Sequence, residues 1–229
     1  MVNVYRVRKE FQSNKCRRTT VAAGAGIKIF NSSSLDGEIN TCNVNVDWSK
    51  DIWSENGAVS AVSPQVLDCA YGDRCEGGSE IDAYVYIMKN MGLASEKGYP
   101  YTEKNGTCDE NREDDFVEDS SIDGLVVVRP QTENELRRAL CRRPVTAEIA
   151  ANSLEFEQYD GGIFNGPCGQ DIDHTVLVVG FGSDENGVEY WKIQNFWGES
   201  WGEQGYMRLA LEAGGKCQIA MEASFPLVE

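Results

Sequence analysis

The chain contains one histidine, His174, which lies directly before the apolar run 175–181. Imidazole is the side chain whose ordinary pKa lies closest to neutral, so it is the usual general base in catalysis. A single histidine excludes a two-histidine zinc motif and a relay of several histidines. Any histidine-dependent chemistry in this chain must therefore run through His174.

A predicted β-hairpin brings a carboxamide close to this imidazole. Residues 175–181 and 188–194 read as strands, and Asn186-Gly187 between them is a strong turn sequence. Antiparallel pairing around this turn places Asn195 opposite His174 to within about three residues. The Asn195 oxygen can then accept a hydrogen bond from one ring nitrogen and leave the other to act as a base. On spacing alone, a structural histidine at a strand end, with Asn195 as a turn residue, is the alternative.

The elements that must position this pair divide into an early helical part and a late strand-rich part. Helices are predicted at 63–71, from Ser79 to Gly92, and from the capping box at Thr132 to Pro144. A further strand is predicted at 205–211, and no internal repeat is evident. Segregated helices and strands favour an α+β fold. Residues 1–43 show little core periodicity, so we expect a poorly specified N-terminal segment.

Composition excludes several classes of function. A net charge of −16 repels phosphate backbones, so no nucleic-acid partner is expected. No apolar run approaches the roughly 20 residues of a membrane span, and no signal peptide is visible. The eight cysteines form no CxxC pair, which argues against a structural metal site and favours disulfides in an oxidising compartment. Buried free thiols are the alternative.

A series of short motifs follows in order between Val44 and Glu229. They are Val46-Asp47-Trp48, Gly57-Ala58-Val59, Asp68-Cys69, Cys75-Glu76-Gly77-Gly78, Tyr99-Pro100-Tyr101, Gly161-Gly162-Ile163-Phe164, Gly166-Pro167-Cys168-Gly169, Asp173-His174, Asn195-Phe196-Trp197-Gly198, Trp201-Gly202-Glu203-Gln204-Gly205-Tyr206, Cys217 and Ala223-Ser224-Phe225-Pro226. These motifs resemble the papain family of cysteine peptidases, with plant, bromelain-like enzymes the nearest. Their order and spacing along the chain make the resemblance specific.

The resemblance implies a two-part α+β fold in residues 44–229. It places a helical left part at about 63–125 and a β-rich right part, resembling an antiparallel barrel, at about 126–215. The helical part is expected to be incomplete.

The resemblance also assigns roles to individual residues. It implies that His174 is the general base and forms an ion pair with a cysteine thiolate. Asn195 would orient His174, and Trp197 would cover their hydrogen bond. Gly77-Gly78 matches the backbone strip that binds an extended peptide, and Ile172 would line the pocket for the second residue before the cut bond.

The cysteines follow the same resemblance in part. It pairs four of them, Cys69 with Cys108 and Cys168 with Cys217. Cys75 needs a third partner, for which Cys16 and Cys42 are both candidates. Cys141 has no family partner, and we expect a free thiol there.

The segment that carries the family's nucleophile is absent, because Val62 runs directly into Ser63 where that segment should lie. Residues 20–27 resemble part of the family's central helix, and Cys16 precedes them. One interpretation makes Cys16 a displaced nucleophile at a helix N-terminus, where the dipole favours a thiolate. The other is that the chain has no nucleophile.

Three carboxylates depart from the family's pattern. Glu80, Glu148 and Glu222 fall where the family often carries smaller or apolar groups around the substrate cleft. If Glu222 lies at the base of the specificity pocket, a basic side chain would be preferred there. The alternative is that all three are solvated surface groups.

These features predict a papain-like cysteine endopeptidase that hydrolyses peptide bonds through a Cys-His-Asn mechanism. The alternatives are an inactive homologue that binds peptides or protein inhibitors in a remnant cleft, and a mis-spliced product that folds poorly. The resemblance further implies peptide or protein substrates, protein inhibitors of cysteine peptidases as partners, no cofactor and no metal. We expect a monomer in a secreted, vacuolar or lysosomal setting.

Overall fold

The structure is a computed structural model that describes residues 64–70, 78–94, 98–100, 102, 104, 106–109, 120–129, 131–141, 143–211 and 215–227. The predicted N-terminal segment 1–43 lies outside them. The described residues form two compact units, one of residues 64–126 with 226 and 227, the other of residues 127–225. Within this described part, no helix combines the length and apolarity needed to cross a membrane.

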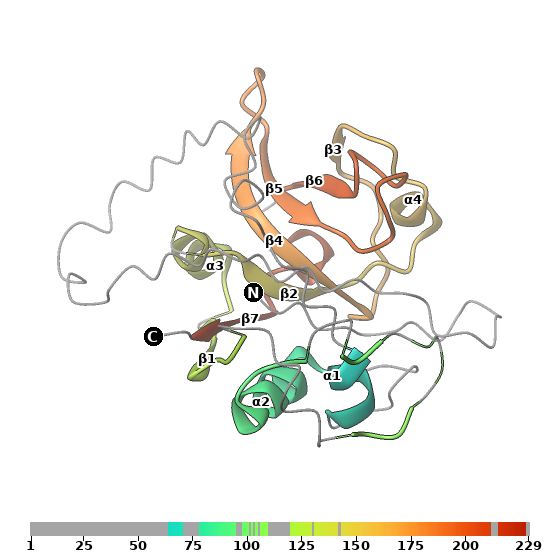
Figure 1. The fold of residues 1–229 in the computed structure, drawn as a ribbon. Coiled ribbons are helices and arrows are strands. Elements are labelled where there is room, and N and C mark those ends of the chain that lie inside the picture. Colours follow the sequence, from blue (N-terminus) through green and yellow to red (C-terminus); the bar gives the residue numbers. More distant parts are fainter. Residues whose placement is uncertain are drawn as a thin grey trace, which may run out of the picture. The chain divides into compact units, whose positions relative to one another are not determined.

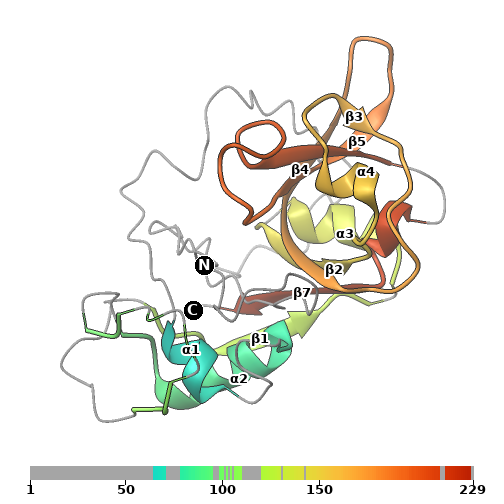
Figure 2. The same ribbon diagram turned by 90° about the vertical axis from the view of Figure 1, so that its right-hand side faces the viewer.

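The first unit contains two helices, α1 (Pro64–Cys69) and α2 (Glu80–Asn90), which lie side by side in both ribbon views (Figures 1 and 2). Apolar side chains recur along α2 at helical spacing and are buried against α1. The small core that they form consists of Val66, Ala83, Tyr84, Ile87, Leu93 and Ile122. Both helices were predicted from their caps and spacing, and both are confirmed.

The two ends of α2 show how local sequence sets a helix boundary. The Ser79 hydroxyl accepts a hydrogen bond from the Ile81 N–H at 3.1 Å, as an N-cap residue should. At the other end Met91 adopts the left-handed conformation with φ of 55°, and Gly92 follows it. The predicted end at Gly92 is therefore one residue late, because a methionine takes the position that glycine usually occupies.

Polar side chains of α1 form hydrogen bonds with the surrounding loops. The buried Gln65 side chain accepts from the Ala94 N–H at 2.8 Å. Asp68 accepts from the Gly106 N–H at 2.8 Å and from the Tyr99 hydroxyl at 3.1 Å. Burial and the nearby Asp68 carboxylate raise the pKa of Tyr99, so the phenol stays protonated and keeps donating.

The second unit contains most of a seven-stranded sheet with the order β1-β7-β2-β4-β5-β6-β3, while residues 124–126 of β1 and 226–227 of β7 belong to the first unit. The strand pairs of known register are antiparallel except β3 with β6, which is parallel. The sheet is open, with β1 and β3 at its edges, so the predicted barrel-like closure is wrong while the α+β class is confirmed. The strands are β1 (Gly124–Val127), β2 (Val145–Ile149), β3 (Ile163–Phe164), β4 (His174–Ser183), β5 (Glu189–Gln194), β6 (Tyr206–Ala210) and β7 (Glu222–Leu227).

Three short helical segments accompany the sheet, namely α3 (Glu133–Leu140), α4 (Leu154–Glu157) and the 3-10 turn η4 (Lys216–Gln218). The predicted cap of α3 is confirmed, since the Thr132 hydroxyl accepts from the Glu135 N–H at 3.3 Å. Leu136 on α3 is fully buried and belongs to the main core. This core also holds inward-facing residues of β2, β4, β5 and β6, so it supports the strands that carry His174.

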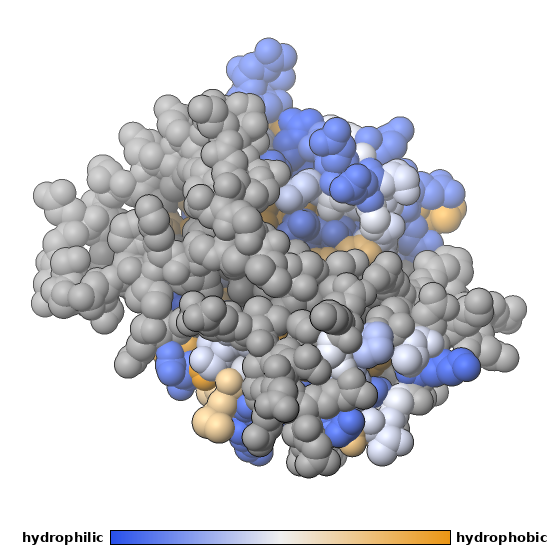
Figure 3. Space-filling view, viewed as in Figure 1, coloured by the Kyte–Doolittle hydropathy of each residue, from blue (hydrophilic) through white to orange (hydrophobic). Residues whose placement is uncertain are grey.

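The β4–β5 hairpin has the turn that its sequence predicts. The Asp184 carboxylate accepts from the N–H groups of Asn186 and Val188 at 2.9 and 2.8 Å, and Gly187 takes a φ of 80°. The hairpin tip, at the top of Figures 1 and 3, is hydrophilic. A register shift between Val178 and Gly180 interrupts the pairing. This β-bulge was not predicted.

Candidate active site

His174 is the first residue of β4, and its ring meets the side chain of Asn195. The distance from His174 Nε2 to Asn195 Oδ1 is 2.9 Å. The regular pairing of β4 with β5 ends at Leu177 opposite Gln194, so Asn195 lies just beyond the paired strand. The two side chains are only 8% and 5% exposed, which strengthens the hydrogen bond by excluding water.

A second hydrogen bond fixes the direction of the first. The backbone N–H of Phe196 donates to Asn195 Oδ1 at 2.7 Å. A backbone N–H can only donate, so this atom is the carboxamide oxygen. The oxygen cannot donate to the imidazole, and His174 Nε2 must therefore carry the hydrogen. Nδ1 is then the ring nitrogen with the basic lone pair.

Trp197 lies against the histidine ring. The two ring centroids are 5.0 Å apart, with 34° between the ring planes. Trp197 also makes edge contacts with Phe156 at 5.9 Å and with Trp201 at 5.2 Å. The indole is thus held from two sides against the His174 ring, and its predicted role as a cover for the His174–Asn195 hydrogen bond stays a prediction.

The loop that carries Asn195 is closed on itself by backbone hydrogen bonds. The Asn195 N–H donates to the Gly205 carbonyl at 2.8 Å, and the Gly205 N–H donates to the Trp201 carbonyl at 2.8 Å. Gly202 has a φ of 56°, and a Cβ there would lie 2.6 Å from the Tyr206 carbonyl oxygen. Only glycine fits this close approach, so the loop geometry depends on that position.

A charged pair anchors the same loop to β6. Glu203 accepts bidentately from the Arg208 guanidinium, with contacts of 2.6 to 3.1 Å, and from the Gly162 N–H at 3.0 Å. Burial by itself would raise the pKa of Glu203. The hydrogen bonds from Arg208 and Gly162 together have a larger effect, so the pKa of Glu203 is lowered. Burial raises the pKa of the adjacent Tyr159 to about 12. The Glu203–Arg208 pair was not predicted to support the site, although both residues lie in or beside a family motif.

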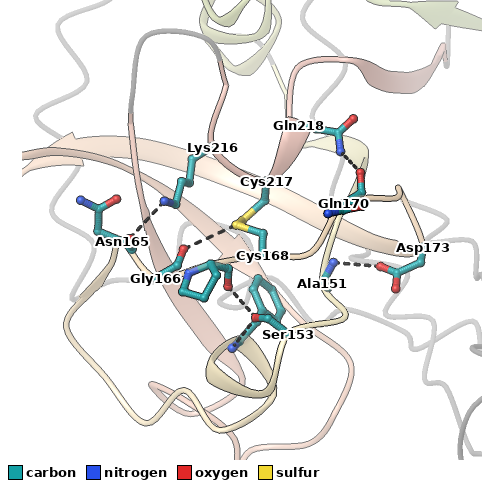
Figure 4. The surroundings of a disulfide bond; sticks show 12 residues. Ala151, Ser153, Asn165, Gly166, Cys168, Gln170, Asp173, Lys216, Cys217 and Gln218 are labelled. Atoms are coloured by element: carbon teal, nitrogen blue, oxygen red, sulfur yellow. Dashed lines mark hydrogen bonds between the residues drawn. A yellow bond between two sulfur atoms is a disulfide. The ribbon is translucent and has the colours of Figure 1, made fainter.

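The residues just before His174 are fixed by contacts with β2 and the chain after it. The Asp173 N–H donates to the Ile149 carbonyl at 3.0 Å, and the Asp173 carboxylate accepts from the Ala151 N–H at 2.8 Å, as Figure 4 shows. Ile172 precedes them and is half-buried. Its predicted contact with substrate stays a prediction.

The predicted peptide strip is described only in part. Gly78 is half-buried immediately before the Ser79 cap of α2, in the first unit. Gly77 lies outside the described residues, as do Cys75 and the displaced-helix candidate with Cys16. The role of Gly77-Gly78 therefore stays a prediction.

The described cysteines are all engaged in disulfides. Cys69 is joined to Cys108 in the first unit. Cys168 is joined to Cys217 in the second unit, where the neighbouring Lys216 and Gln218 donate to the Asn165 and Gln170 carbonyls (Figure 4). Cys141 is disulfide-bonded as well, so the expectation of a free thiol there is wrong. That expectation was based on the disulfide pairs that the family resemblance implies, which include no partner for Cys141.

These disulfides bear directly on the chemistry. No described cysteine is a free thiol, so the described residues offer His174 no sulfur nucleophile. They also contain no group of three histidine, cysteine, aspartate or glutamate side chains that could hold a metal ion. The described part of the site is therefore a buried imidazole that is hydrogen-bonded to a carboxamide and in contact with an indole ring.

Comparison with known proteins shows which family the chain resembles. A family profile described as "Papain family cysteine protease" matches residues 45–227. The chain is 43% identical over 174 residues to "Cysteine proteinase COT44" of Brassica napus, a match that covers 74% of the chain and 52% of the relative. It is 40% identical over 174 residues to "Fruit bromelain" of Ananas comosus, covering 75% and 48%. The chain thus spans about half the length of the curated relatives it matches.

The chain is also similar in structure to a solved protease. The bromelain protease from Ananas comosus, solved in complex with the E64 inhibitor, superposes with a TM-score of 0.69 at 38% identity. The match covers 76% of this chain and 81% of that one. With the family profile covering most of its length, the chain belongs to the papain family of cysteine proteases.

Proposed function

We propose that this chain is a cysteine endopeptidase in which His174 acts as the general base and Asn195 orients it. The observation that carries the proposal is the buried 2.9 Å hydrogen bond between His174 Nε2 and Asn195 Oδ1. It fixes the imidazole in the tautomer whose Nδ1 accepts a proton, as nucleophilic catalysis requires. The Trp197 ring, which lies 5.0 Å from the His174 ring between centroids, supports this role because it would limit access of water to that bond.

The proposed reaction has two stages. A cysteine S–H gives its proton to His174 Nδ1, and the thiolate attacks the carbonyl carbon of the scissile peptide bond. The resulting intermediate expels the amine, which takes the proton from Nδ1, and leaves a thioester on the enzyme. Water then attacks the thioester carbonyl while Nδ1 takes its proton, and the thiol is regenerated with release of the acid.

The thiol must come from outside the described residues, since the described cysteines are in disulfides. We propose Cys16 as the candidate, because the sequence after it resembles the family's central helix. Peptide and protein substrates, and protein inhibitors of cysteine peptidases, are the partners that this function implies. The disulfides favour a secreted, vacuolar or lysosomal location, where oxidised cysteines persist.

Labelling with iodoacetamide at mildly acidic pH tests both assignments. We expect rapid labelling that mass spectrometry maps to Cys16. Labelling should slow markedly in His174→Gln, and peptide hydrolysis should fall by about 10²–10⁴-fold. Asn195→Ala should lower kcat more than it raises KM, because the residue orients the base and does not bind substrate.

Cys16→Ser is the matched control for the label. A chain that unfolds cooperatively, yet labels no cysteine rapidly and cleaves no peptide, would contradict the proposal. That result would leave a family member that binds peptides or inhibitors without cleaving them. Absence of any cooperative transition would instead indicate a product that does not fold.

A further inference from the structure

The loop 195–205, which carries Asn195, is joined along its second half to residues 157–162, the end of α4 and the turn that follows it. We call this contact the loop seam. Its three hydrogen bonds run from Trp201 Nε1 to the Glu157 carbonyl at 2.9 Å, from the Gly202 N–H to the Tyr159 carbonyl at 3.2 Å, and from the Gly162 N–H to the Glu203 carboxylate at 3.0 Å.

Tyr159 lies at the centre of the seam and is only 6% exposed. Its carbonyl holds Gly202, and its ring lies against the Trp201 ring with 5.4 Å between the centroids. Its hydroxyl donates to the Gly162 carbonyl at 2.6 Å and accepts from the Arg208 N–H at 3.3 Å. Tyr159 therefore joins the turn, the loop and β6 at one point.

A continuous series of backbone hydrogen bonds leads from Tyr159 to Asn195. The Tyr159 carbonyl holds the peptide N–H that directly follows Trp201. The Trp201 carbonyl accepts from the Gly205 N–H at 2.8 Å, and the Gly205 carbonyl accepts from the Asn195 N–H at 2.8 Å. Asn195 Oδ1 then meets His174 Nε2 at 2.9 Å. The position of the carboxamide thus depends on where Tyr159 holds the loop.

The contact between Tyr159 and the loop leaves no room for the loop to move inward. A Cβ added at Gly202 would lie only 2.8 Å from the Tyr159 ring, and Gly202 has a φ of 56°. Closely packed groups pass a displacement on to their neighbours because they cannot absorb it. A change at Tyr159 should therefore shift the loop as a whole.

We propose that Tyr159 is a positioning residue for the base, which holds loop 195–205 so that Asn195 Oδ1 stays in place to accept from His174 Nε2. The inference rests on the proposed function for the use of His174 in catalysis. It goes further by assigning a role to a residue that acts through the loop. A small displacement of a catalytic group is enough to lower a rate, so such support matters for turnover.

The single histidine makes the inference measurable without turnover. Only His174 can give imidazole signals in a ¹⁵N NMR spectrum, so they need no assignment. A hydrogen held in a buried hydrogen bond exchanges with water only when that bond opens. We expect Tyr159→Phe to speed exchange of the Nε2 hydrogen on the order of tenfold, because the seam loses the hydroxyl's hydrogen bonds.

Two controls separate positioning from general loosening. Tyr190→Phe removes the same hydroxyl from a half-buried position on β5 and should leave the exchange rate unchanged. Leu136→Ala removes a fully buried side chain of α3, so it should lower stability in urea without changing the exchange rate. If Tyr159→Phe fails to fold, Glu203→Gln, at a position about one-third exposed, should still speed exchange.

The outcomes separate this inference from the proposed function. Wild-type exchange in Tyr159→Phe, or equally fast exchange in Leu136→Ala, would overturn the inference whether or not the chain cleaves peptides. Faster exchange in Tyr159→Phe alone, in a chain that cleaves no peptide, would support the positioning role and contradict the peptidase. If the chain does cleave peptides, Tyr159→Phe should lower kcat severalfold and leave KM unchanged, whereas a change in KM alone would overturn the inference.

Discussion

The two faces of the same three strands, β2, β4 and β7, differ sharply in chemistry. The core face is buried, and it is apolar except at its end, where His174 pairs with Ile149; its apolar residues are Val145, Ala147, Ile149, Val176, Val178 and Ala223. The opposite face is mostly polar, and consists of Thr146, Glu148, Thr175, Leu177, Glu222 and Ser224. Most of that second face is nevertheless buried, with Thr146, Thr175 and Ser224 exposed by 3%, 4% and 1%.

This difference decides how much each face contributes to stability. Burying apolar groups on the core face stabilises the fold in proportion to the area removed from water. Burying a hydroxyl gives no such gain unless it finds a hydrogen-bond partner, and Thr175 Oγ1 has none. Changes on the core face should therefore alter the free energy of unfolding more than changes on the polar face.

The largest effect is expected from the core face. Ile149→Ala removes a fully buried side chain paired directly with His174, and we expect it to lower the free energy of unfolding by about 2–5 kcal/mol. Urea denaturation measures the loss. The matched control is Leu154→Ala at a position 62% exposed, where we expect a change within about 0.5 kcal/mol. Similar losses of unfolding free energy in both variants would show that the core face contributes no more to stability than an exposed position does.

The loop that carries Asn195 is held in part by the Glu203–Arg208 pair. Glu203→Gln should lower the free energy of unfolding at neutral pH by about 1 kcal/mol, a modest value because both partners of the pair are about one-third exposed. The pKa of Glu203 is lowered in the folded chain, so its contribution is fully present above the ordinary value of 4.5 and is lost as pH falls through the folded value.

Thermal melts between pH 7 and pH 3 measure this dependence. The difference between wild type and Glu203→Gln should shrink as the pH falls below about 4.5. Glu199→Gln, an exposed position in the same loop, is the control and should show no such trend. A stability difference that does not change with pH would show that the ionised Glu203 carboxylate does not contribute to the stability.

A smaller effect is expected where the backbone is strained. Gln218 has a φ of 62° and Cys217 before it has a φ of 52°, both in the left-handed region that favours glycine. Gln218→Gly should raise stability by up to about 1 kcal/mol, less what the exposed hydrogen bond to the Gln170 carbonyl contributes. Gln218→Ala keeps the strain and loses that bond, so it should not stabilise. Equal effects of both changes would exclude backbone strain.

The smallest stability effect is expected on the polar face. Thr175→Val keeps the shape of the side chain and removes a buried hydroxyl that has no partner, so unfolding should change by less than about 1 kcal/mol, toward greater stability. Chemical denaturation beside Ile149→Ala makes the comparison direct. A loss as large as that of Ile149→Ala would show that the Thr175 hydroxyl contributes to the fold.

The sequence predicted elements whose signals are local. Caps and apolar spacing predicted α1, α2 and α3, and the Asn186-Gly187 turn predicted the hairpin. β2 was missed, although it lies between β7 and β4 in the middle of the sheet. Its five residues mix threonine and glutamate with apolar side chains, because both faces are used and only one is apolar. A short strand of that composition has no clear period.

The sequence by itself determined that any histidine-dependent chemistry must run through His174, since there is no other histidine, and that a hairpin brings Asn195 close. Both follow from residue count and short-range spacing. Only the tertiary structure decided that Thr175, Glu148 and Glu222 form one row. These residues come from three strands that are neighbours in the sheet but not consecutive along the chain, and their register is set by core packing on the opposite face. No local pattern encodes such a pairing, because a shift of one residue would reverse every side chain.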